Sequence, residues 1–203
     1  MKLLIALLIA SFAMFMGHAQ QKSDSVAWEF TADANFYIFP DEFIFLPVFQ
    51  ANKEKLHLEA RYNYEDLRTF SGWVGYNFTG GKKLEYVITP MLGGVVGNSN
   101  GIAPGLEFTL TKNRFELYSE AECLFELNKE NSFIYNWTDL TYSINDRLWA
   151  GISAQRTRLY KTNLEIQRGV LVGASWKKFE ITTYLYNVGF DTAFTLVTLT
   201  SNF

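Results

Sequence analysis

The sequence predicts an all-β fold, a transmembrane antiparallel up-and-down β-barrel of about 12 strands, within a range of about 10 to 14. Three observations predict this fold. Apolar and polar residues alternate along most of the chain, aromatic residues make up 17% of it, and the mean hydropathy is only −0.03. That hydropathy is far too low for a bundle of membrane helices, whereas strands that face lipid on one side and water on the other combine both kinds of residue.

The beginning of the chain has the pattern of a secretory signal peptide. A positively charged residue precedes an apolar run over residues 3–16, and the small residues Gly17 and Ala19 lie at the −3 and −1 positions of a cut after Ala19. The run of about 14 residues is shorter than the roughly 20 residues of a membrane-spanning helix. We therefore predict a signal peptide over residues 1–19 and an outer-membrane β-barrel over residues 20–203.

The alternation has a period of two residues, which is the period of a β-strand. In residues 56–66 the even-numbered positions from Leu56 to Tyr64 are apolar or aromatic, and the odd-numbered positions are polar. In residues 115–127 the odd-numbered positions are mostly apolar, and four glutamates occupy even-numbered positions. The predicted strands are residues 27–39, 43–51, 56–66, 71–79, 84–97, 102–111, 115–127, 133–144, 148–157, 164–176, 179–187 and 193–203.

Every second connection between these runs is short and basic. Such connections are typical of tight hairpins on one rim of a barrel. An even number of strands places both chain ends at that same rim, which in the usual topology is periplasmic. The five connections are residues 52–55, 79–83, 112–114, 145–147 and 177–178.

One run does not keep its parity. In residues 133–144, Tyr135 and Trp137 occupy odd positions, whereas Leu140 and Tyr142 occupy even positions. A β-bulge in the middle of this strand would let both sets face the same side, because a bulge redirects half of a strand. The sequence therefore predicts a bulge there.

A soluble β-sandwich or a lipocalin-like cup is the alternative fold, since either would also show alternation. Both should bury their aromatic residues inside, and neither would need twelve strands. The barrel explains the count of runs more simply.

The last ten residues, 194–203, resemble the C-terminal strand of bacterial outer-membrane β-barrel proteins, which alternates and ends in an aromatic residue. In that family the barrel-assembly machinery recognises this strand, so the resemblance implies that Val197, Leu199 and Phe203 form an assembly signal. It also implies a location in the bacterial outer membrane, in contact with its lipid and lipopolysaccharide. The same architecture serves porins, enzymes, adhesins and assembly factors, so it does not by itself fix a function.

No catalytic constellation is visible, and we expect no enzyme. Outer-membrane phospholipases and lipid A deacylases resemble one another in a His-x-Ser pair, but this chain has Glu59 two residues after His57. With Cys123 as the single cysteine and His57 as the single histidine after residue 19, neither an internal disulfide nor a Cys/His metal site is possible. We expect no cofactor, and the net charge of −3 argues against nucleic acid as a partner.

If the apolar faces contact lipid, the opposite faces line an ionic lumen. Carboxylates would set a cation preference in a water-filled lumen, which predicts a porin-like passive channel for ions or small solutes. Salt bridges would instead fill a narrow barrel, which predicts a non-conducting structural or surface barrel. An enzyme acting on lipid is the third alternative. The predicted lumen-lining residues are Glu59, Arg61, Glu107, Glu116, Glu120, Glu122, Glu126 and Arg158.

Overall fold

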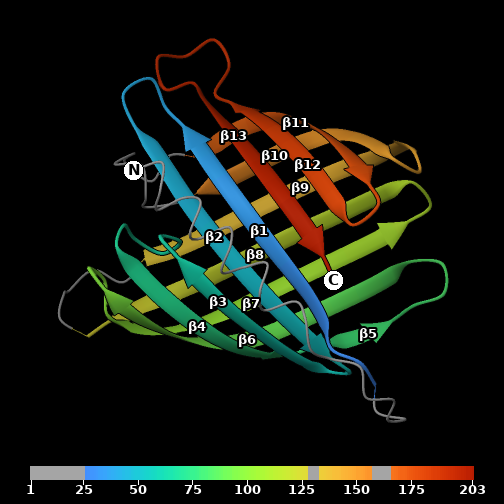
Figure 1. Cartoon of the computed structure of the whole chain (residues 1–203), viewed down its shortest axis with the longest axis horizontal. Helices are drawn as coiled ribbons and strands as arrows, with labels where there is room; N and C mark the ends of the chain where they lie inside the picture. Colours follow the sequence, from blue (N-terminus) through green and yellow to red (C-terminus); the bar gives the residue numbers. More distant parts are fainter. Residues whose placement is uncertain (1–25, 128–132, 157–165) are drawn as a thin grey trace, which may run out of the picture.

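The computed structural model describes residues 26–127, 133–156 and 166–203, which form one continuous antiparallel sheet (Figure 1). Within these ranges no helix is long and apolar enough to cross a membrane. The predicted signal peptide lies outside the described residues. The strands are β1 (Glu29–Ile38), β2 (Phe43–Lys53), β3 (Leu56–Tyr62), β4 (Thr69–Tyr76), β5 (Phe78–Gly80), β6 (Glu85–Gly97), β7 (Gly101–Lys112), β8 (Phe115–Glu126), β9 (Phe133–Asn145), β10 (Leu148–Arg156), β11 (Gln167–Trp176), β12 (Phe179–Tyr186) and β13 (Phe194–Asn202).

The sheet closes on itself because β13 pairs with β1 and, at the other end of the strand order, β4 pairs with β6. The short strand β5 continues the line of β4 after Asn77, and both segments pair with β6. The barrel therefore has twelve strands around its circumference, as predicted. Closure leaves no second sheet that could form a sandwich.

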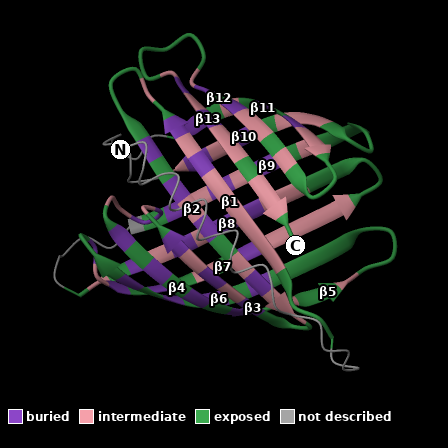
Figure 2. Ribbon diagram, viewed as in Figure 1, coloured by how far each residue is buried: buried purple, intermediate pink, exposed green. Residues whose placement is uncertain are grey.

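Burial alternates along the strands, which gives the barrel a chequered appearance (Figure 2). On β3, Leu56 and Tyr62 are exposed on the outer wall, whereas His57, Glu59 and Arg61 are buried inside. This is the reverse of a soluble protein, because large apolar side chains cover the outside and charged groups fill the interior. A continuous apolar outer wall of this kind is suited to lipid.

The predicted basic hairpins lie together at one end of the barrel, which we call the basic rim. They connect β2 to β3, β5 to β6, β7 to β8, β9 to β10 and β11 to β12. The backbone is left-handed at Glu54, Asn113 and Lys177, as tight hairpin turns require. The opposite end, which carries the other connections, is called the loop rim.

Lysine and aromatic side chains pair on the outside of the basic rim. The Lys177 ammonium lies 4.8 Å from the ring centre of Trp176, and two further pairs have the same arrangement. A ring beside a cation suits the boundary between hydrocarbon and lipid headgroups, where amphipathic aromatic residues gather. The further pairs are Lys53 with Trp28 and Lys55 with Tyr76.

The predicted bulge in the middle of β9 is wrong. The register between β8 and β9 runs without interruption from Phe115 opposite Tyr142 to Leu124 opposite Phe133. Trp137 points into the barrel and Leu140 points outward. Tyr135 and Trp137 face inward because this half of the lumen is packed with aromatic rings. The strand therefore needs no bulge to turn them toward lipid. The register shift that does occur lies beside the β9–β10 hairpin, between Leu148 and Trp149.

Neighbouring glycines on β6 should respond in opposite ways to substitution. A Cβ at Gly93 would lie 2.5 Å from the Trp73 indole, whereas a Cβ at Gly94, on the outer face, would meet nothing within 4 Å. Because overpacking forces side chains out of their preferred positions, Gly93→Ala should lower the free energy of unfolding by about 1–3 kcal/mol. Gly94→Ala is the matched control and should change it by no more than about 0.5 kcal/mol. Urea unfolding of the refolded barrel measures both, and equal effects would contradict the close approach of Trp73.

Candidate functional site: an ionic lumen

The half of the lumen near the loop rim is filled with buried apolar and aromatic side chains. The Tyr186 ring stacks on Phe194 with ring centres 4.9 Å apart, and Tyr64 meets Tyr135 edge to face at 5.1 Å. These residues come from the ends of β9, β12 and β13 and from the β3–β4 loop. The remaining members include Tyr37, Ile44, Leu46, Val95, Ala103, Leu124 and Leu196. Packed rings thus close this half of the barrel in the described structure.

Arg61 forms the centre of the ionic lumen and bridges across it from β3 to β7 and β8. Its Nε donates to Glu59 Oε2 at 2.5 Å, and its Nη1 donates to Glu120 Oε1 at 2.6 Å and to Glu122 Oε2 at 3.2 Å. Its Nη2 lies 3.6 Å from Glu107 Oε1. Arg61 is only 1% exposed. We call these five residues the Arg61 cluster.

The Arg61 guanidinium is also held between two aromatic rings. Its central carbon lies 4.4 Å from the Tyr64 ring centre and 4.7 Å from that of Trp73. The Tyr64 hydroxyl donates to Glu120 Oε2 at 2.5 Å, so the same ring that stacks on the cation also binds one of its anions. Planar stacking and forked donation together explain why arginine rather than lysine suits this position.

The Arg61 cluster carries more negative groups than positive ones. Four carboxylates surround one guanidinium, and Glu122 Oε1 has no hydrogen-bond partner among the described residues. At positions as buried as these, unbalanced charges are costly. Protons or another cation must therefore compensate part of the negative charge.

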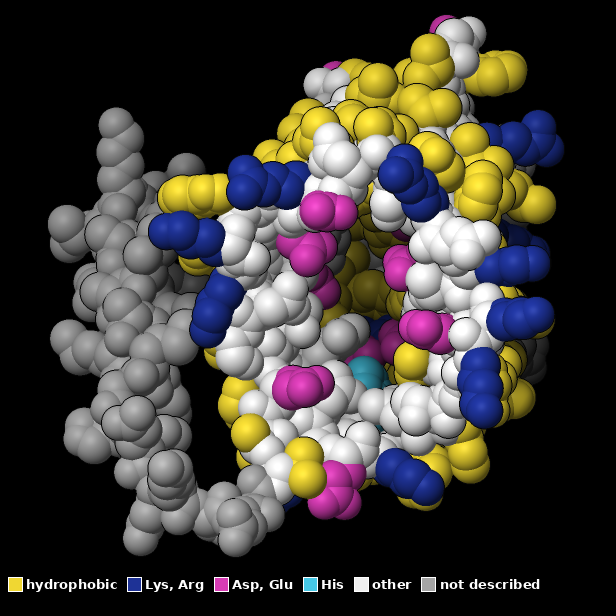
Figure 3. All heavy atoms as spheres, turned by 90° about the vertical axis from the view of Figure 1, so that its right-hand side faces the viewer, with side chains coloured by type: hydrophobic (Ala, Val, Ile, Leu, Met, Phe, Trp, Pro, Cys, Tyr) yellow, Lys and Arg dark blue, Asp and Glu magenta, His cyan; other side chains and the backbone are white. Residues whose placement is uncertain are grey.

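The half of the lumen near the basic rim is hollow and acidic. One cavity of about 360 Å³ is lined by Asp33, Glu59 and Glu107, among others, and a second of about 330 Å³ is lined by Glu116. The two cavities share five lining residues, which makes them one space. Figure 3 looks into this end and shows acidic side chains around the hollow, with lysine and arginine outside it. We call the space the acidic vestibule; its shared lining residues are Tyr118, Asp139, Glu180, Thr182 and Tyr184.

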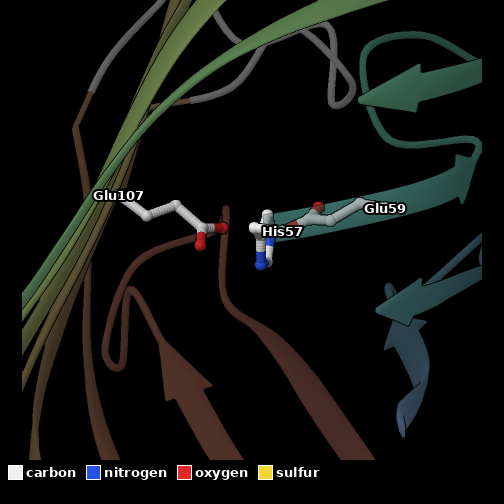
Figure 4. A group of neighbouring side chains, drawn as sticks. All are labelled: His57, Glu59 and Glu107. Carbon is white, nitrogen blue, oxygen red and sulfur yellow. The ribbon is translucent and has the colours of Figure 1, made fainter. Parts of the chain in front are cut away.

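His57 lies in the interior beside two of the vestibule's carboxylates (Figure 4). Its Nδ1 is 2.8 Å from Asn52 Oδ1, and its Nε2 is 2.6 Å from Glu59 Oε1. One ligand-type atom from each of His57, Glu59 and Glu107 lies within 4.8 Å of the other two. All three residues are buried.

The structure brings five of the eight predicted lumen residues together in the Arg61 cluster. Glu116 lies apart from them, on the wall of the acidic vestibule. Glu126 lies near the loop rim, where its Oε1 accepts a hydrogen bond from Ser99 Oγ at 2.7 Å. Arg158 lies outside the described residues.

The predicted assembly residues lie on the last strand. Leu199 is exposed on the outer wall, and Val197 shares its face. Phe203 follows β13, stacks on Phe30 with ring centres 6.0 Å apart, and exchanges two backbone hydrogen bonds with it. These contacts complete the seam between β13 and β1.

The sequence interpretation placed Tyr64 on the lipid face, which is wrong. Strand β3 ends at Tyr62, and the left-handed backbone of Asn63 (φ 60°) turns the chain so that Tyr64 enters the lumen. Glu65 follows it inward and accepts hydrogen bonds from Ser71 Oγ at 2.5 Å and Trp73 Nε1 at 3.3 Å. An asparagine after a strand signals such a turn, because its side chain tolerates the left-handed conformation. Asp139, on β9, was also missed as a lumen residue.

No protein-family model matches the chain, and no curated protein matches its sequence. Among solved structures, the KdgM porin matches with a TM-score of 0.64 and 13% identity, covering 85% of this chain and 99% of KdgM. The same porin in complex with disordered oligogalacturonate matches with a TM-score of 0.63 and equal identity and coverage. The outer membrane protein Omp33 of Acinetobacter baumannii has a TM-score of 0.49, too low to support an inference. The closed twelve-stranded antiparallel barrel of this chain is therefore the fold of an outer-membrane porin.

Proposed function

We propose that the chain is a porin-like barrel of the bacterial outer membrane that allows passive entry of small cations and cationic solutes. The acidic vestibule is the observation that carries this proposal. Among the described residues, its walls hold seven carboxylates and one arginine, namely Asp33, Glu59, Glu107, Glu116, Glu120, Asp139 and Glu180 with Arg61. Rings of carboxylates in a narrow space concentrate cations and repel anions.

The solute class should differ from the one in the KdgM complex. That structure contains oligogalacturonate, a chain of acidic sugars. The acidic vestibule would repel such a polyanion. Likeness in fold thus supports a porin-like barrel, and the local charge supports a cationic cargo.

Passage through the whole barrel requires movement at the loop rim. Packed rings fill the lumen there in the described structure, and the Arg61 cluster bridges it at the inner end of the acidic vestibule. The β3–β4 loop is the segment best placed to move, because Tyr64 and Glu65 enter the lumen from it rather than from a strand. We propose that the described form is the closed state of the channel.

Ion selectivity tests the proposal. Removing negative charge from the vestibule wall with Glu116→Gln and Glu180→Gln should lower the cation-to-anion permeability ratio by about two- to fivefold, since fixed charge sets the local ion concentration. Reversal potentials in planar bilayers under a salt gradient measure this ratio. Both residues lie outside the Arg61 cluster, so folding should be preserved.

The matched control for selectivity is Asp146→Asn. Asp146 is exposed in the β9–β10 hairpin of the same basic rim but outside the vestibule. It should leave the permeability ratio unchanged. If Asp146→Asn and the vestibule variants act equally, the charge of the rim rather than that of the lumen sets selectivity.

A non-conducting structural barrel is the second candidate. The filled loop-side half of the lumen favours it, because a packed core rigidifies a barrel and leaves no path for solute. It predicts no current from the wild type at any voltage, together with a heat-modifiable gel shift that demonstrates folding. Contacts with outer-membrane lipid and lipopolysaccharide, and recognition of the last strand by the assembly machinery, are parts of either proposal.

A further inference from the structure

We propose that His57, Glu59 and Glu107 bind a divalent transition-metal cation, preferably Zn²⁺, at the inner end of the acidic vestibule. Figure 4 shows the Glu107 carboxylate extending from β7 toward the imidazole and carboxylate that β3 supplies. This inference concerns a binding site and does not require the barrel to conduct.

The three side chains have the composition and spacing of a metal site. One imidazole nitrogen and two carboxylate oxygens lie within 4.8 Å of one another. Zinc takes His nitrogen and carboxylate oxygen at about 2.0–2.2 Å in a tetrahedral arrangement, so two ligand atoms around it lie roughly 3.4 Å apart. Rotation of the two glutamate side chains would bring the three atoms to that spacing. Water would complete the coordination.

A chain of hydrogen bonds orients the histidine for this task. Thr89 Oγ1 donates to Asn77 Oδ1 at 2.7 Å, and Asn77 Nδ2 donates to Asn52 Oδ1 at 2.9 Å. Asn52 Oδ1 therefore accepts, and the partner at 2.8 Å, Nδ1 of His57, donates its proton to it. Metal-binding histidines are commonly held in this way through their second nitrogen. The other nitrogen, Nε2, is directed at Glu59.

The strand beside His57 leaves space for its ring. Gly75 on β4 pairs with His57, and a Cβ at Gly75 would lie 3.3 Å from the imidazole Cδ2 and 3.0 Å from Thr89. A larger residue would press the ring out of its position. The β3 backbone, the small Gly75 and the hydrogen bonds through Asn77 and Asn52 together fix the direction of His57 Nε2.

The carboxylates around His57 favour the binding of a cation. Glu59 Oε1 lies 2.6 Å from His57 Nε2, and a carboxylate oxygen of Glu107 lies within 4.8 Å of both residues' ligand atoms. Glu59 uses its other oxygen, Oε2, for Arg61, which leaves Oε1 available. Nearby, Oε1 of the buried Glu122 has no hydrogen-bond partner among the described residues, so this part of the lumen leaves an acceptor unsatisfied.

The donor set favours zinc over calcium or magnesium. Calcium and magnesium prefer oxygen ligands throughout, whereas imidazole suits zinc and its transition-metal neighbours. The acidic vestibule supplies the route of entry, because Glu59 and Glu107 line its cavity.

Calorimetric titration of the refolded wild-type barrel with ZnCl₂ tests the site. We expect one Zn²⁺ per chain, with about one to two protons released, since the ligands must lose their protons. Proton release is obtained by comparing buffers of different ionisation enthalpy, and affinity should fall as pH is lowered. His57→Gln and Glu107→Gln should each weaken binding at least about tenfold, and Asn52→Ala, which removes the orienting acceptor, by about tenfold.

Glu116→Gln is the matched control, because it removes a vestibule carboxylate outside the site. It should weaken Zn²⁺ binding by no more than about twofold, because it removes one charge of the vestibule and no ligand of the metal. Co²⁺ absorption in the visible range provides a second readout, and its nitrogen-dependent bands should be absent from His57→Gln. A heat-modifiable gel shift verifies that each variant is folded. Absence of saturable binding, or equal weakening by Glu116→Gln and Glu107→Gln, would overturn the site and leave only diffuse attraction to an acidic cavity.

Discussion

Replacing Arg61 with methionine should destabilise the barrel by about 3–5 kcal/mol, because removing one partner of a buried ion pair leaves the other charges uncompensated. Arg61 is 1% exposed and lies within 3.6 Å of four carboxylates. A methionine side chain fills much of the volume of the arginine side chain but carries no charge. Urea unfolding from lipid vesicles, followed by tryptophan fluorescence, measures the loss.

The control for Arg61 is Arg114→Met, at an exposed arginine of the β7–β8 hairpin. It should change stability by no more than about 0.5 kcal/mol. Adding Glu120→Gln and Glu122→Gln to Arg61→Met should restore part of the lost stability, since two of the four uncompensated carboxylates are then removed. A loss below about 1 kcal/mol at pH 8 would show that the Arg61 cluster does not hold the strands together.

The strands could be predicted because a membrane barrel requires apolar and polar residues to alternate with a period of two. Residues 115–127 illustrate this, since alternating glutamates and apolar residues require only that one face be polar. In the structure Glu116, Glu120 and Glu122 do lie on the inner face of β8. The pattern failed where both faces carry aromatic residues, as in β9, because rings suit either lipid or a packed lumen.

The partners of Arg61 could not be predicted from the pattern. The alternation predicts that Arg61, Glu107 and Glu120 face inward, but it does not predict which strands lie opposite one another across the lumen. That depends on the strand number and on how far the strands are staggered, which together set the barrel's diameter. Tyr64 was missed for a different reason, since one left-handed residue, Asn63, ends the alternation and both Tyr64 and Glu65 then enter the lumen.

Releasing the β3–β4 loop should open the channel if the proposed function is right. Tyr64 is anchored inside by hydrogen bonds to Glu120 and Tyr135, and Glu65 by Ser71 and Trp73. Tyr64→Ala combined with Glu65→Ala removes both anchors. We expect at least a tenfold rise in the fraction of time that single channels conduct in planar bilayers, which corresponds to about 1.4 kcal/mol in favour of the open state.

The wild-type channel should also open more readily as pH rises. Burial raises the pKa of the Glu65 carboxyl in the inward loop, so the closed state binds a proton that a solvated, outward loop releases. Proton binding therefore favours closure, and this advantage is lost as pH increases from the ordinary value of 4.5 through the raised pKa. Glu65→Gln should remove the dependence, because its amide does not titrate.

Arg68→Ala separates release of these anchors from general softening of the loop. Arg68 lies in the same loop but is exposed. Its backbone N–H donates a hydrogen bond to Asn63 Oδ1, so this bond does not involve the Arg68 side chain. It should therefore conduct like the wild type, with the pH dependence intact. If the Tyr64 and Glu65 double variant folds, as a heat-modifiable gel shift would establish, and carries no current at any pH, the packed rings rather than the loop close the lumen. The barrel would then be a structural one, in which Arg61 serves the assembly of strands and not the passage of ions.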